Sequence, residues 1–95
     1  MVMNNPKELL ENLYAAFLKA ETEQELALFL DDLCTIKELE SMSQRLTAAK
    51  MLLDGKTYNE IVEDTDISSA TLARVSKCVR YGNGGYKNII SKMDK

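Results

Sequence analysis

Residues 57–77 read TYNEIVEDTDISSATLARVSK and contain the signals of two short helices joined by a tight turn. Thr57 and Glu60 have the spacing of a capping box, in which each side chain satisfies an exposed backbone donor of the other residue. Ser68 is the expected N-cap of the second helix. Asp66 lies in the expected turn, where a short acidic side chain tolerates a left-handed backbone conformation. This arrangement predicts a helix-turn-helix, a motif that usually reads DNA.

The expected second helix has one apolar face and one outward face. Leu72, Val75 and Val79 recur at spacings of three and four, which predicts a stripe packed against the first helix, with Ile67 as the buried anchor of the turn. The positions left facing outward are Ser69, Ala70, Ala73, Arg74 and Lys77. Capping residues and apolar stripes are also common in small helical bundles, so a purely structural bundle is the alternative interpretation.

The composition is that of one small globular domain. The chain has 95 residues, of which 45% are hydrophobic and 28% are charged. We expect Cys34 and Cys78 to be reduced, packed thiols of a cytoplasmic protein, and the lack of His and of a closely spaced Cys pair argues against a metal or other cofactor. No apolar run approaches the roughly 20 residues that cross a bilayer, so no membrane partner is expected. Because a core of this size is modest, oligomerisation is the expected source of further stability.

The charge is distributed unevenly along the chain. The net charge of −3 is the sum of −5 over residues 1–54, −3 over residues 55–67 and +5 over residues 68–95. Arg74, Lys77 and Arg80 belong to the expected second helix of the motif, so positive charge is present where a DNA reader needs it. The alternative is structural, since cations near a helix C-terminus favour the helix dipole whatever the function.

Two helices are expected in the first third of the chain. Asn5 and Pro6 predict a helix start, and that helix should run to about Lys19. A second capping box, from Thr22 to Glu25, predicts the next helix. Both have wide apolar faces formed by Leu9, Leu10, Leu13, Tyr14, Phe17 and Leu18, then by Leu26, Leu28, Phe29, Leu30 and Leu33. Faces of this width predict that residues 1–34 pair with a second copy of the chain.

The remaining signals complete an all-α domain of about six helices over residues 1–95. A capping box from Thr35 to Glu38 predicts a long central helix over residues 35–55, followed by the helix-turn-helix over residues 57–81. Residues 82–95 hold a glycine segment and a short final helix, expected near residues 86–93.

This organisation resembles the Trp repressor superfamily, and in detail its YerC/YecD-type branch. The resemblance rests on Arg45-Leu46, Leu52-Leu53-Asp54-Gly55, the stretch from Ile67 to Arg74 and the glycine segment from Tyr81 to Tyr86. It implies an intertwined homodimer whose recognition helices enter successive major grooves of double-stranded DNA about 34 Å apart. It also implies a transcriptional regulator, expected to act as a repressor.

The resemblance further implies a small-molecule effector pocket. Arg45 matches the arginine that packs over the indole of tryptophan, and Arg74 matches the arginine that pairs with its carboxylate. Val75 stands where the family has a glycine beneath the indole, and Cys78 replaces a serine that helps to hold the amino group. These two departures argue against tryptophan, so the effector is left open. The alternative is that both arginines pair with acidic neighbours, such as Glu38 or Asp54.

Contacts with DNA are expected along the recognition helix. The resemblance assigns groove approach or base-edge contact to Ser68, Ser69, Ala70 and Ala73, and phosphate contact to Thr71 and Lys77. The glycines Gly82, Gly84 and Gly85 form a candidate nest of backbone N–H groups for an anion, although such a segment more often simply ends a helix.

Three classes of function compete. The first is a homodimeric, sequence-specific DNA-binding regulator. The second is a protein-interaction module that uses the helix-turn-helix as a scaffold without binding DNA, which the negative total charge would favour. An enzyme is not expected, because the chain offers no His, no cysteine paired with a plausible base and no phosphate-binding loop.

Overall fold

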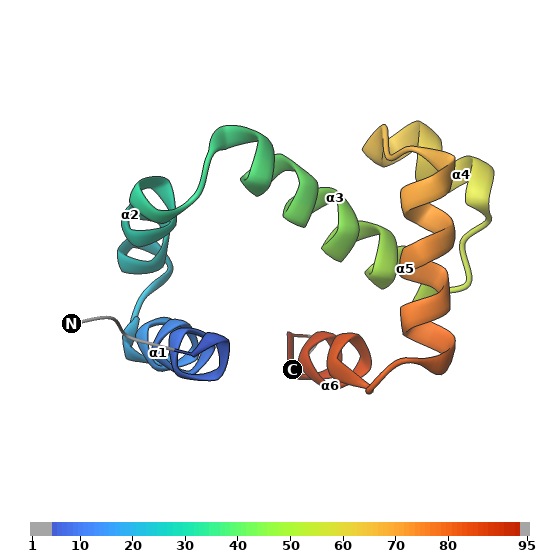
Figure 1. Ribbon diagram of the computed structural model, residues 1–95. Helices are drawn as coiled ribbons and strands as arrows, with labels where there is room; N and C mark the ends of the chain where they lie inside the picture. The colour runs from blue at the N-terminus through green and yellow to red at the C-terminus, as the bar shows by residue number, and fades with distance from the viewer. Residues whose placement is uncertain (1–4, 94–95) are drawn as a thin grey trace. The chain divides into compact units, whose positions relative to one another are not determined.

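The computed structural model describes residues 5–93 and is all-α, with no strand among these residues. Figure 1 shows the six helices in chain order, which are α1 (Pro6–Lys19), α2 (Glu23–Leu33), α3 (Ile36–Leu53), α4 (Tyr58–Thr65), α5 (Ser69–Tyr81) and α6 (Gly85–Met93). The expected all-α class is therefore confirmed. The final helix begins at Gly85, one residue earlier than the sequence predicts.

The predicted capping residues begin four of the helices. The side chains of Asn5, Thr22, Thr57 and Ser68 each accept a hydrogen bond from the backbone N–H three residues later, at 2.9–3.2 Å. The second capping box predicted that the Glu25 carboxylate accepts from the backbone N–H of Thr22. In the structure it accepts from the backbone N–H of Glu21 instead. The local signals thus place these four helix starts correctly but not every cap partner.

Residues 1–36 form the first of two compact units and contain α1 and α2. Phe17 of α1 meets Phe29 of α2 edge to face, with ring centroids 5.9 Å apart. Neither helix buries a single residue. Leu18 is 85% exposed and Leu28 is 70% exposed, so the apolar faces of these helices remain uncovered within the chain.

Residues 37–95 form the second unit, which holds the hydrophobic core. Its fully or almost fully buried apolar side chains are Ala48 and Ala49 of α3, Ile61 of α4, Ile67 of the turn, Leu72 and Val75 of α5, and Ile90 of α6. Figure 1 shows α4 near the first half of α5, while the C-terminal end of α3 comes up to the middle of α5. Alanine side chains on α3 are short, which permits this close approach of the helices.

The turn between α4 and α5 has the conformation that the sequence predicts. Asp66 is the only non-glycine residue between 5 and 93 with a positive φ, and its angles of 61° and 19° are left-handed. Ile67 is only 2% exposed, as expected for its anchor, and its N–H donates to the Thr65 hydroxyl. The Gln44 side chain donates to the Thr65 carbonyl at 3.1 Å and so ties α3 to the end of α4. The helix-turn-helix is therefore held against the core of the second unit.

Candidate nucleic-acid interface and effector pocket

The N-terminal half of α5 presents small side chains outward. Ser69, Ala70 and Ala73 are exposed, whereas Leu72 on the opposite face is fully buried. Small side chains leave the helix backbone accessible, so this face can approach the floor of a major groove closely. The sequence predicted this division between the two faces.

Positive charge follows the small side chains along the same helix. Arg74, Lys77 and Arg80 are exposed, and no acidic residue lies between Ser69 and Tyr81. Thr71 was expected to contact a phosphate. In the structure it is half-buried, and its hydroxyl accepts a hydrogen bond from the Ser68 hydroxyl at 2.9 Å. The exposed face of α5 is thus uniformly neutral or basic.

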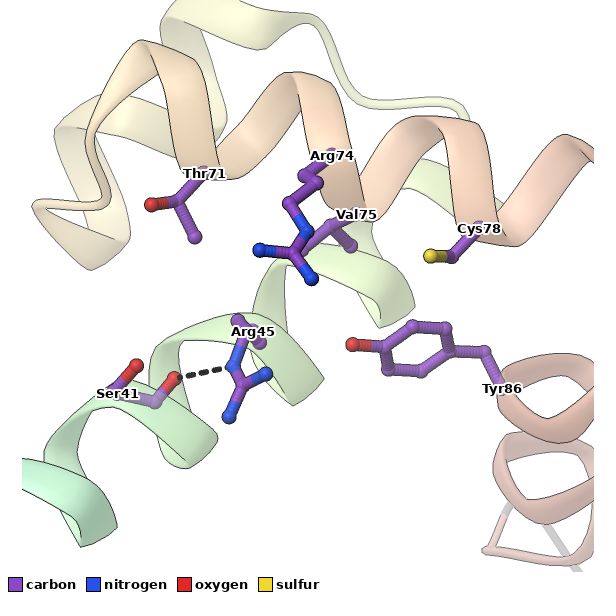
Figure 2. A pocket seen from close by; sticks show the side chains of 7 residues that line it. All are labelled: Ser41, Arg45, Thr71, Arg74, Val75, Cys78 and Tyr86. Carbon is purple, nitrogen blue, oxygen red and sulfur yellow. Dashed lines mark hydrogen bonds between the residues drawn. The ribbon is translucent and has the colours of Figure 1, made fainter. Parts of the chain in front are cut away.

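A pocket of about 290 Å³ lies beside α5, entirely within the second unit. It is lined by Ser41 and Arg45 of α3, by Thr71, Arg74, Val75 and Cys78 of α5, and by Tyr86 of α6 (Figure 2). The four residues expected at an effector pocket are therefore brought together.

Three lining residues were missed by the sequence reasoning. Ser41 could have been found, since it precedes Arg45 by four residues and such residues share a helix face. Thr71 lies three residues before Arg74 and four before Val75, so the same rule would have placed it on the face that lines the pocket. No local signal marks Tyr86, because it reaches the pocket from a separate helix.

The polar groups of the pocket have few partners among its lining residues. Figure 2 draws one hydrogen bond among the seven, a long one of 3.4 Å from Nε of Arg45 to the Ser41 carbonyl. The Arg74 side chain extends from α5 toward α3, and the hydroxyl end of Tyr86 points toward the two arginines. Both arginines therefore belong to the lining of one pocket.

The other wall of the pocket is formed by Val75 and Cys78. Val75 is only 2% exposed, and its branched side chain belongs to the core cluster as well as to the pocket wall. Cys78 is a free thiol, as expected, but it is exposed rather than packed. The expectation of a packed thiol was wrong for Cys78, because the side of α5 that it occupies faces the pocket instead of the core.

The glycine segment has a structural reason for its composition. The N–H of Gly82 donates to the Cys78 carbonyl at 2.9 Å, and a Cβ added at Gly82 would lie 2.3 Å from that same oxygen. Gly84 has a φ of +85°, which side chains rarely adopt, and Gly85 begins α6. The Gly82 amide is therefore already used to end α5. An anion nest in this segment stays a prediction, limited to the other amides.

The described residues contain neither a metal-binding cluster nor a membrane-spanning helix. Between residues 5 and 93, no group of His, Cys, Asp or Glu side chains could hold a metal ion. Within the same range, none of the helices combines the length and the apolar character that crossing a membrane requires.

Comparison with known proteins gives consistent matches. Residues 8–94 match the family model described as Trp repressor protein. The uncharacterized protein YerC of Bacillus subtilis strain 168 is 40% identical over 84 residues, which span 88% of this chain and 81% of YerC. A crystal structure from Staphylococcus aureus, assigned provisionally as a Trp repressor, is 40% identical with a TM-score of 0.89 and covers 92% of this chain and 87% of its own. A crystal structure of a TrpR-like protein from Eubacterium eligens ATCC 27750 is 39% identical with a TM-score of 0.89, and it covers 95% of this chain and 96% of its own.

Proposed function

The chain belongs to the Trp repressor family, and from that premise we propose that it is a sequence-specific DNA-binding transcriptional regulator that acts as a homodimeric repressor. The recognition helix is α5, and its N-terminal half enters the major groove. Ser68, Ser69, Ala70 and Ala73 approach the base edges, while Lys77 neutralises a phosphate.

One observation carries the DNA-binding proposal. The outward face of α5 combines small side chains in its first two turns with three exposed basic residues in the turns that follow. The buried face of the same helix is anchored by Leu72 and Val75, so the outward face is held in a defined orientation. A helix that presents this surface from a helix-turn-helix fits a major groove and its flanking phosphates.

A second observation supports the homodimer. The helices α1 and α2 bury no residue, although most of their large apolar side chains are at least one-third exposed. Such an apolar surface is unfavourable in water, and a second copy of the same surface would cover it. Sedimentation velocity should show a dimer at micromolar concentration. A single monomeric species at every concentration would refute this part of the proposal.

The effector is not expected to be tryptophan. Val75 is almost fully buried and its side chain lines the pocket, so it occupies the space that an indole ring would need. Titration calorimetry with L-tryptophan tests this directly. Saturation in the micromolar range would overturn it.

Selection from a random DNA library tests the main proposal. The purified protein is incubated with the library at near-physiological salt, and the retained fragments are sequenced. A homodimeric reader should enrich a motif with two-fold symmetry, because its two recognition helices are related by symmetry. No enrichment at low or moderate salt would refute DNA reading and favour a protein-interaction module.

A further inference from the structure

The pocket beside α5 has a positively charged lining. Arg45 and Arg74 come from two different helices and face one cavity, and none of the seven lining residues is acidic. A guanidinium group stays protonated throughout the physiological pH range. Two like charges around one small cavity repel each other, and an anion between them would relieve that repulsion.

Two hydroxyl groups add neutral donors to the same cavity. The hydroxyl end of Tyr86 points toward the arginines. The Thr71 oxygen accepts a hydrogen bond from the Ser68 hydroxyl at 2.9 Å, which leaves the hydrogen of Thr71 available to another acceptor. The polar lining is therefore rich in donors, as recognition of carboxylate or phosphate oxygens requires.

The dimensions of the pocket favour a compact ligand. Its volume of about 290 Å³ lies just below the range of about 300–1,000 Å³ that is usual for small-molecule sites. Val75 closes one side with a branched, buried side chain. A ligand with a large ring would collide with Val75, whereas a short, highly charged ligand would place its oxygens near both arginines.

We propose that this pocket binds a compact anion with two negative charges, either a small dicarboxylate or a phosphate group, and that Arg45 and Arg74 hold it together. This names the effector class for the regulator proposed above. It rests on that function only for the consequence of binding, since the binding step itself requires no DNA.

Titration calorimetry of the full-length protein, at constant ionic strength and without DNA, tests the inference. The titrants are sodium succinate, sodium phosphate and, as a single-charge control, sodium acetate. Saturation is expected with one dianion per chain, and acetate should bind at least about tenfold more weakly because it can engage only one arginine well. Succinate alone would identify a dicarboxylate site, and phosphate alone would identify a phosphate site.

Matched variants separate this pocket from general positive charge. Arg45→Gln and Arg74→Gln should each weaken the dianion at least about tenfold. Arg80→Gln removes the same charge from an exposed position of α5 outside the pocket and should change affinity less than about twofold. Circular dichroism melts verify that each variant is folded, and these exposed substitutions leave the core intact.

Three results would overturn the inference. They are no saturation by either dianion at millimolar concentration, an equal loss of affinity in Arg80→Gln, or unchanged affinity in both pocket variants. Because DNA is absent from these titrations, such results leave the DNA-binding proposal standing. A failed DNA selection would likewise leave a positive titration intact, so the two failures are distinguishable.

Discussion

Lys77→Ala should flatten the salt dependence of DNA binding. Lys77 is exposed on α5, three residues beyond Arg74, and the proposed docking directs it to a phosphate. Each neutralised phosphate contributes about 0.9 to the slope of log K against log salt, so a dimer that loses one contact per subunit should lose about 1.8 from its slope. Between 50 and 200 mM salt, the variant should therefore lose about twelvefold less affinity than the parent protein.

Fluorescence anisotropy with a labelled duplex from the DNA selection measures this slope at five or more salt concentrations. Lys37→Ala is the matched control, because it removes one exposed lysine from α3, outside the recognition helix. Alanine is a good helix former, so neither substitution should disturb folding. The docking is refuted if both variants keep the parent slope or lower it equally. A change of about 0.9 would instead indicate one contact per complex, and so a monomeric reader.

Three further substitutions test the scaffold that positions α5. Leu72→Ala removes most of a fully buried side chain and should lower the free energy of unfolding by about 3–5 kcal/mol. Calorimetric unfolding would detect this as a large fall in Tm, and a shift of only a few degrees would contradict the place of Leu72 in the core. Gly82→Ala should lower the Tm because its Cβ would meet the Cys78 carbonyl at 2.3 Å, whereas Gly85→Ala meets nothing within 4 Å and should be neutral or stabilising by up to about 1 kcal/mol; equal effects of the two would refute the clash. Asp66→Gly should stabilise the protein by about 1 kcal/mol, since glycine adopts the left-handed φ of 61° without steric cost, and a lower denaturation midpoint in urea would show that the Asp66 side chain contributes something else.

Helix boundaries and the turn could be predicted because they depend on short-range interactions. The Thr57 and Ser68 side chains each satisfy a donor only three residues away, so the residue types alone indicate where these helices begin. The left-handed turn at Asp66 is also local, since it reflects the conformations that a short acidic side chain tolerates. The Glu25 carboxylate shows the limit of such rules, because two nearby backbone donors compete for it.

The effector pocket could be predicted only in part. Arg45 and Arg74 were expected there from the resemblance, but their separation of 29 positions carries no geometric information by itself. Cys78 has the spacing of a packed residue and yet is exposed, because the side of α5 that it occupies faces a cavity rather than another helix. Periodicity identifies which residues share a face, but it does not identify what covers that face.

The sequence by itself determined the all-α class, the helix starts and the division of α5 into a buried and an outward face. Each of these depends on contacts within about one helical turn, or on a periodicity that a single segment displays. Only the tertiary structure decided that Tyr86 joins the two arginines and that Val75 closes the same cavity. That convergence depends on how α3, α5 and α6 pack around the buried residues of the second unit, and the angles of such packing are set by many side chains at once.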